Sequence, residues 1–107
     1  MLTCIIRYQI APTKKAQFEE YSRNWGQAIP RCGADLIGYY APHEGSSTLA
    51  YGIYNVASLA DYEAYRARLA ADPIGRENYE FAQKEKFLLR EDRAFLKLAS
   101  APHGEET

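Results

Sequence analysis

The residue best suited to acid–base chemistry is His43, which stands just before a short polar turn at residues 44–47. An imidazole titrates near neutral pH and can therefore give or accept a proton, and Glu44 follows His43 directly in the chain. Neighbouring residues of a strand point to opposite faces, so the two side chains need not touch. The alternative is a half-exposed turn histidine without a chemical role. The other histidine, His103, falls in the C-terminal tail and is not a candidate.

Arg7 is the second candidate, because it stands in the middle of an alternating stretch, residues 2–10. An arginine inside a strand needs a carboxylate, an aromatic ring or a ligand beside its guanidinium. Arg7 could hold an anion inside a cavity. The alternative is a salt bridge at a subunit interface, or a side chain that reaches the solvent at the rim.

Tyrosine is unusually frequent, with nine residues against four phenylalanines. Its apolar ring and polar hydroxyl suit surfaces that are buried but polar, such as interfaces and cavities. Tyr39 and Tyr40 point oppositely on one strand, as do Tyr51 and Tyr54 on the next, so only part of this set shares a face. Trp25 fits a helix core, and its helix can also flank a cavity mouth. The predicted catalytic residues are therefore His43 and Arg7, and the predicted substrate-binding residues are Tyr39, Tyr40, Tyr51 and Trp25.

Other chemistries find no support in the sequence. No His, Cys or carboxylate cluster has metal-ligand spacing, and phosphate loops, nucleotide fingerprints and nucleophile elbows are missing. We therefore expect no metal and no cofactor. A cofactor-free oxygenase stays compatible with this pattern, because its substrate supplies the electrons. We interpret the charged residues Arg66, Arg68 and 90–93 as solvated side chains or interface ion pairs that contribute little to stability.

Composition and charge limit the kinds of partner and the location that we expect for this protein. The formal net charge is −1 without a basic block, so nucleic acid is not an expected partner. No apolar run approaches the roughly 20 residues that span a bilayer, and the first residues do not resemble a signal peptide. Cys4 and Cys32 are expected to be reduced thiols. We expect a soluble cytoplasmic protein of one domain, residues 1–99, followed by a flexible tail, residues 100–107.

Periodicity predicts the elements that position these residues. Alternation indicates strands over residues 2–10, 35–43, 48–56 and 87–98. Apolar residues at three- and four-residue steps predict a helix over 14–29, with Phe18, Tyr21, Trp25 and Ile29 inward and Thr13 as N-cap. A second helix follows Ser58 as N-cap and ends before Pro73, and a weaker helical segment covers 74–86.

This order is the β-α-β-β-α-β arrangement of the ferredoxin-like α+β fold, with a four-stranded antiparallel sheet and helices on one face. The other face would carry Ile5, Arg7 and aromatic residues of the two middle strands, which is too apolar to face water. We expect a second copy of the chain to cover it. Two such sheets face to face would enclose a cavity lined partly by tyrosine.

Several stretches resemble the NIPSNAP family: residues 36–45, residues 50–52, the tyrosine- and arginine-rich helix 59–69 with Asp72-Pro73, and residues 87–96. The resemblance covers residues 1–99 and implies a dimeric α/β barrel. Relatives of this barrel include small monooxygenases, haem-degrading enzymes and lactone isomerases. The family carries no settled catalytic motif, and since the sequence shows no transit peptide, the resemblance implies a bacterial cytosolic member.

Two functional hypotheses follow. The first is a homodimeric barrel that binds or converts a small, aromatic molecule, as a cofactor-independent oxygenase-like or isomerase-like enzyme, with His43, Arg7 and Tyr51 around the cavity. The second is a non-catalytic protein–protein interaction module, in which the tyrosines serve only the dimer and a partner. Whether the protein is an enzyme stays open at this point.

Overall fold

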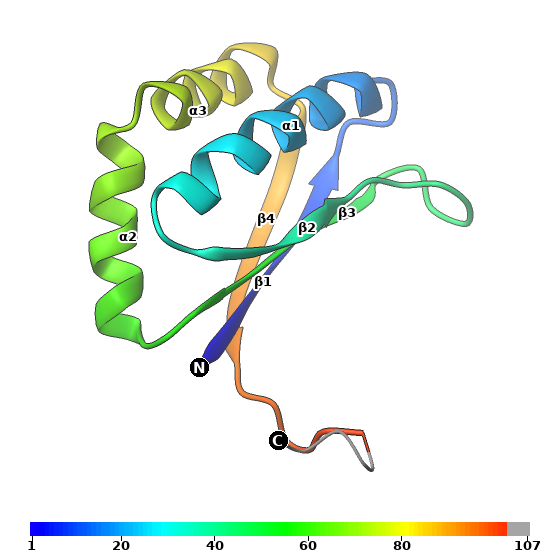
Figure 1. The fold of residues 1–107 in the computed structure, drawn as a ribbon. Helices are drawn as coiled ribbons and strands as arrows, with labels where there is room; N and C mark the ends of the chain where they lie inside the picture. Colours follow the sequence, from blue (N-terminus) through cyan, green and yellow to red (C-terminus); the bar gives the residue numbers. More distant parts are fainter. Residues whose placement is uncertain (103–107) are drawn as a thin grey trace.

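The computed structural model describes residues 1–102; His103 and the rest of residues 103–107, which close the predicted tail, lie outside the described part. Within residues 1–102 the chain forms four strands and three helices (Figure 1). In chain order these are β1 (Leu2–Ile10), α1 (Lys15–Arg31), β2 (Asp35–Tyr40), β3 (Leu49–Val56), α2 (Leu59–Ala71), α3 (Pro73–Glu85) and β4 (Leu88–Leu96).

The strands of the described chain form one antiparallel sheet in the order β2-β3-β1-β4. The helices lie together on one side of this sheet (Figure 1). The arrangement confirms the predicted ferredoxin-like fold, with α2 and α3 in the place of its second helix. The first and last strands are distant in sequence but adjacent in space, because β1 pairs with both β3 and β4.

Strict alternation along β1 decides which side chains face the helices. Cys4, Ile6, Tyr8 and Ile10 are buried against them, whereas Arg7 and Gln9 point to the other face and are exposed. Antiparallel pairing carries this division to the neighbouring strands. Ile6 lies opposite Gly52 of β3 and Arg93 of β4, so these two residues face the helices as well.

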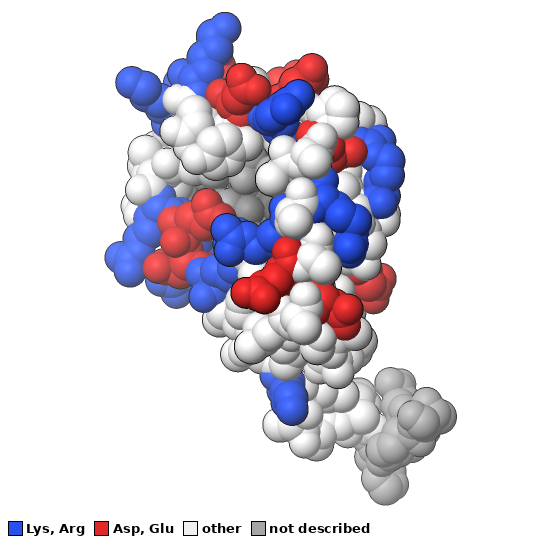
Figure 2. Space-filling model, turned by 90° about the vertical axis from the view of Figure 1, so that its left-hand side faces the viewer, with Lys and Arg blue, Asp and Glu red and all other residues white. Residues whose placement is uncertain are grey.

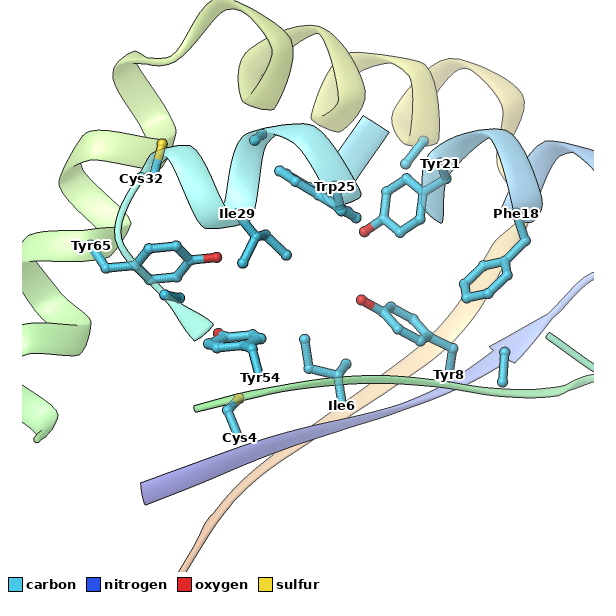
Figure 3. Packing of buried hydrophobic residues seen from close by; sticks show 14 of the residues in the cluster. Cys4, Ile6, Tyr8, Phe18, Tyr21, Trp25, Ile29, Cys32, Tyr54 and Tyr65 are labelled. Atoms are coloured by element: carbon cyan, nitrogen blue, oxygen red, sulfur yellow. The ribbon is translucent and has the colours of Figure 1, made fainter. Parts of the chain in front are cut away.

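The inward stripe of α1 packs onto this face of the sheet. Phe18, Tyr21, Trp25 and Ile29 are all buried, as predicted (Figure 3). Phe18 meets Tyr8 edge to face, with ring centroids 5.4 Å apart. Burial of each such large side chain contributes about 1.5–3 kcal/mol. The helix and the sheet are therefore held together mainly by aromatic contacts.

Two of the predicted helix boundaries differ from the structure. Thr13 does not cap α1, because Lys14 occupies the N-cap position and makes no side-chain capping hydrogen bond. The helix also continues through Pro30 to Arg31, since a proline in the last turn leaves most of the helical hydrogen bonds intact. Ser58 caps α2 as predicted, and its hydroxyl accepts the backbone N–H of Asp61 at 3.1 Å.

Strand β2 is shorter than expected and irregular. It ends at Tyr40 instead of reaching His43, and its pairing with β3 shifts between Leu36 and Gly38. The shift leaves Tyr39 opposite Gly52, on the helix side, and Tyr40 opposite Tyr51, on the other side.

Polar contacts fix α3 to α1. The Arg31 guanidinium contacts both carboxylate oxygens of Asp72 at 2.7 Å, and Asp72 also accepts the backbone N–H of Gly75 as the N-cap of α3. Asn78, which is buried, donates to the Tyr21 carbonyl oxygen at 3.0 Å. These contacts fix α3 and its junction with α2 against α1.

Candidate functional site

A cavity of about 660 Å³ lies between the helix-covered face of the sheet and the three helices of the described chain. This volume is within the range of roughly 300–1,000 Å³ that is usual for small-molecule sites. Figure 2 shows the molecule from the side of α2, where its surface is hollowed and the hollow is bordered by basic and acidic side chains. Seven tyrosines of the described residues contribute to the lining: Tyr8, Tyr21, Tyr39, Tyr54, Tyr62, Tyr65 and Tyr79.

Strands and α1 supply the aromatic interior of the cavity. Tyr21 stands perpendicular to Tyr8, with ring centroids 6.1 Å apart, and meets Trp25 edge to face at 5.6 Å. The hydroxyl oxygens of Tyr8 and Tyr39 lie 3.4 Å apart. The hydroxyl groups of Tyr8, Tyr21 and Tyr65 point into the space between α1 and the sheet (Figure 3). The cavity therefore combines flat apolar walls with several phenol groups.

These phenols are donors at neutral pH. Burial raises the pKa of Tyr8 and of Tyr39 well above the ordinary value of a tyrosine. Burial likewise raises the pKa of Tyr54 and of Tyr65. A phenol in this state stays protonated, so it can donate a hydrogen bond to a bound oxygen atom but cannot serve as a base.

Strand β4 adds an ion pair to the cavity. Its residues Glu91 and Arg93 lie opposite Tyr8 and Ile6 of β1, so both face the helices. The Arg93 guanidinium donates to a Glu91 carboxylate oxygen at 3.0 Å and to the Tyr62 hydroxyl at 3.4 Å. Both side chains keep more than a third of their surface accessible, 36% and 38%. They can therefore reach a molecule that enters the cavity.

Two further arginines line the cavity from the helices. Arg66 of α2 places its guanidinium carbon 5.6 Å from the centroid of the Tyr62 ring, which is cation–π geometry. Arg76 belongs to α3, and both arginines are exposed. Within residues 1–102 neither of them forms an ion pair.

The indole of Trp25 is an unusual feature of the lining. Trp25 is 8% exposed, and no atom of residues 1–102 accepts a hydrogen bond from its Nε1–H. A buried N–H without an acceptor is uncommon, because such groups lose their hydrogen bonds to water. Trp25 also lines the cavity, so a bound molecule can supply the acceptor.

The structure divides the six predicted site residues into two groups. Tyr39 and Trp25 line the cavity. Arg7 and Tyr51 are opposite one another on the uncovered face of the sheet, Tyr40 is next to Tyr51 on that face, and His43 is exposed in the β2–β3 connection. The cavity is thus on the other side of the sheet from the one that was expected to enclose a site. The catalytic roles of His43 and Arg7 stay predictions.

Sequence reasoning missed the three arginines and Glu91. Arg66 and residues 90–93 read as solvated charge runs, because the covering helices are not visible in a local pattern. The available signal was the alternation of β4: Phe95, Arg93 and Glu91 are two residues apart and share a face. It could be used only once the pairing of β4 with β1 was known.

The described residues meet the requirements of neither a metal site nor a membrane-spanning helix. Among the described residues, no three His, Cys, Asp or Glu side chains are grouped so that they could hold a metal ion. The helices of residues 1–102 are too short or too polar to cross a membrane.

Comparison with known proteins agrees with this fold. The family model NIPSNAP matches residues 3–102. The chain resembles the solved structure of Atu4242 from Agrobacterium tumefaciens with a TM-score of 0.79, 21% identity and coverage of 92% of this chain and 94% of that one. The chain also resembles an uncharacterised NIPSNAP domain protein from Burkholderia xenovorans, with a TM-score of 0.75 and 24% sequence identity. This alignment covers 95% of this chain and 99% of that one.

A third solved structure, from Nitrosomonas europaea, is described as a candidate antibiotic biosynthesis monooxygenase. It aligns with a TM-score of 0.71 and 13% identity over 94% of this chain and 100% of that one. No curated protein matches the sequence significantly.

Proposed function

The chain belongs to the NIPSNAP family, and we propose that it is a homodimeric cytoplasmic enzyme that binds and converts a small aromatic molecule in its tyrosine-lined cavity without a cofactor. The observation that carries this proposal is the cavity itself, because seven phenol rings surround a volume suited to a small molecule. Rings of this kind stack on flat substrates and exclude water from them.

The proposed chemistry passes through an anion of the substrate. In the proposed oxygenation or isomerisation the substrate loses a proton and carries negative charge on an oxygen as an enolate or phenolate. We assign the role of proton acceptor to Glu91, the carboxylate that the described residues bring to the lining. In an oxygenation, the substrate anion then gives its electrons to molecular oxygen from solution. Protonated phenols such as Tyr8 and Tyr39 can donate hydrogen bonds to the anionic oxygen of the substrate, and Arg93 supplies a positive charge nearby. The likeness to a structure described as a candidate monooxygenase makes oxygenation the first reaction to test.

The proposed dimer forms through the uncovered face of the sheet. Ile5 and Ile53 are paired at its centre, and Tyr40 and Leu96 are 52% and 48% exposed on the same face. A face of this kind is rarely left in water by a soluble protein. Cytoplasmic location is supported by two buried cysteines that are both free.

A matched pair of variants tests whether the cavity binds small molecules. Ala67 and Ala70 are both exposed on α2, but only Ala70 lines the cavity. Titration with the neutral fluorescent probe N-phenyl-1-naphthylamine should show saturable binding to the wild type and to Ala67→Trp. Ala70→Trp should abolish it by filling the entrance. Equal binding by both variants, or none by the wild type, would contradict the proposed site.

Catalysis needs its own measurement. An oxygen electrode, with a panel of phenols and naphthols, should detect oxygen uptake that depends on the enzyme and is lost in Ala70→Trp. If compounds bind in the cavity but none of them is converted, the protein is a binding protein and the proposed enzymatic activity is wrong.

The uncovered sheet face also favours one alternative, a non-catalytic interaction module. Its apolar centre would then receive a different protein in place of a second copy. Arg7→Ala and His43→Ala separate the two readings, since both residues lie away from the cavity. No turnover by the wild type, together with loss of partner binding in these variants, would support the module. Turnover by the wild type that is lost in these variants would support a catalytic role of Arg7 and His43.

A further inference from the structure

We propose that the ligand of this cavity is an aromatic anion whose oxyanion pairs with Arg66 and Arg76 and which also accepts a hydrogen bond from the Trp25 indole. The inference rests on the proposed function, because it names the class of molecule that the same cavity takes. Charge balance, hydrogen-bonding capacity and the nature of the walls support it separately.

The charges that line the cavity do not balance. Its charged residues are Arg66, Arg76, Arg93 and Glu91, which gives three positive charges and one negative. Glu91 is already engaged by Arg93 at 3.0 Å. Two positive charges are left over in a chain whose formal net charge is −1, so the excess is local. An anionic ligand would neutralise it.

Arg66 and Arg76 differ from the arginines that make ion pairs. Arg31, Arg90 and Arg93 each contact a carboxylate within 3.0 Å, whereas Arg66 and Arg76 have none among residues 1–102. The Tyr62 ring beneath Arg66 orients its guanidinium without using its donors. Planar guanidinium groups with free donors suit carboxylates and other oxyanions, which they can bind with two hydrogen bonds.

The interior is rich in donors as well. The phenols of Tyr8, Tyr39 and Tyr65 stay protonated, and the Trp25 N–H is buried without an acceptor in the described chain. Among residues 1–102, Glu91 provides the only carboxylate of the lining, and this carboxylate already forms an ion pair with Arg93. A ligand that brings acceptor oxygens satisfies more of these groups than a cationic or donor-rich one.

The walls exclude small hydrophilic anions as the main ligand. Phosphate or acetate would occupy a minor part of about 660 Å³ and leave the aromatic lining in contact with water. A molecule with one or two fused rings covers the phenol faces while its charged group reaches the arginines. The proposed class is therefore an aromatic carboxylate or an equivalent oxyanion of a fused ring.

Two fluorescent probes that differ by one charged group test the proposal. 8-Anilinonaphthalene-1-sulfonate carries a sulfonate, and N-phenyl-1-naphthylamine is the same ring system without it. In the wild type we expect the sulfonate to bind about tenfold more tightly than the neutral probe. The double variant Arg66→Gln/Arg76→Gln should remove this difference and leave the affinity of the neutral probe unchanged.

Arg23 provides a matched control, because it is exposed on α1 outside the cavity and Arg23→Gln removes a charge as well. It should keep the preference for the anion. If the double variant does not fold, the wild type still decides: sodium chloride should weaken binding of the sulfonate and not of the neutral probe. Competition by naphthalene-2-carboxylate, but not by the corresponding carboxamide, extends the test to a carboxylate.

The chain has one tryptophan, so its indole N–H gives a single NMR signal. Naphthalene-2-carboxylate should shift this signal and slow its exchange with water. Equal affinity of the two fluorescent probes, or an equal effect of Arg23→Gln and the double variant, would overturn the inference and leave the proposed cavity standing. If neither probe binds the wild type, both proposals fail.

Discussion

The ring of Tyr39 lies directly over Gly52, its neighbour on the adjacent strand. A Cβ atom on Gly52 would stand 2.7 Å from two ring carbons of Tyr39, closer than side chains approach. The shift in pairing between Leu36 and Gly38 brings Tyr39 to this position, on the cavity side of the sheet. The missing side chain of one strand thus makes room for the aromatic wall of the next.

Gly52→Ala should therefore disturb the cavity and destabilise the protein by about 1–3 kcal/mol, the usual cost of overpacking. Urea unfolding measures the loss, and binding of N-phenyl-1-naphthylamine should weaken in parallel. Gly26→Ala is the control, because among the described residues no atom lies within 4 Å of a Cβ there apart from the chain neighbours of Gly26 and the nearby backbone of its own helix. If the Tyr39 ring is the cause, Gly52→Ala should cost much less in a Tyr39→Ala background.

The pair Arg31–Asp72 should make stability depend on acid pH. Hydrogen bonds from Arg31 and from the Gly75 backbone hold the pKa of Asp72 below its ordinary value. The stabilisation is complete above about pH 3.9, the ordinary value, and is lost as the pH falls through the lowered pKa. Asp72→Asn should lower the melting temperature by several degrees at pH 7, and its difference from the wild type should shrink below pH 4.

Calorimetric melting curves between pH 2 and 7 measure this difference. Arg31→Gln should behave like Asp72→Asn, since it removes the main hydrogen-bond donor. Arg23→Gln should not. A wild-type advantage that persists unchanged at pH 2 would show that Asp72 acts without its charge.

Alkaline pH should unfold the protein through its buried tyrosines. Burial raises the pKa of Tyr8 and Tyr39, so their contribution to stability is complete below about pH 10 and is lost as the pH rises further. Absorbance at 295 nm should report part of the nine tyrosines ionising together with the loss of circular dichroism. Tyr8→Phe should reduce the slope of stability against pH; a gradual titration of all phenols in the folded state would contradict this.

A charge at the centre of the uncovered sheet face should separate the proposed dimer. Ile53 pairs with Ile5 there, so Ile53→Asp would bury a carboxylate between two subunits. Light scattering coupled to gel filtration should give twice the chain mass for the wild type and the chain mass for the variant. Leu59→Asp is the control, because Leu59 is 57% exposed on α2. A wild type that runs as a monomer would end the dimer proposal.

Local patterns predicted the framework of this protein well. Cys4, Ile6, Tyr8 and Ile10 alternate, and the stripe of α1 recurs every three or four residues, so periodicity alone assigned their buried faces. The capping role of Ser58 could also be predicted, because its hydrogen-bond partner, Asp61, is only three residues away. The capping prediction for Thr13 was wrong, and β2 ends earlier than its composition indicated.

The cavity, in contrast, could not be predicted from local sequence patterns. Arg93 enters it because β4 pairs with β1, almost ninety residues earlier in the chain, in one particular register. A shift by one residue would send Arg93 and Glu91 to the other face. Arg66 and Arg76 join them because α3 and its junction with α2 are fixed against α1 by Arg31, Asp72 and Asn78, none of which is adjacent in sequence to its partner.

By itself, then, the sequence determined the order of strands and helices, the ferredoxin-like fold and the buried faces of β1 and α1, because these depend on spacings of two to four residues. Only the tertiary structure decided that seven tyrosines surround one cavity on the helix side of the sheet, and that Arg7 and Tyr51 lie across the sheet from it. The physical reason is that strand register and helix docking are set by contacts between distant segments, and these contacts place the charges that a ligand would meet.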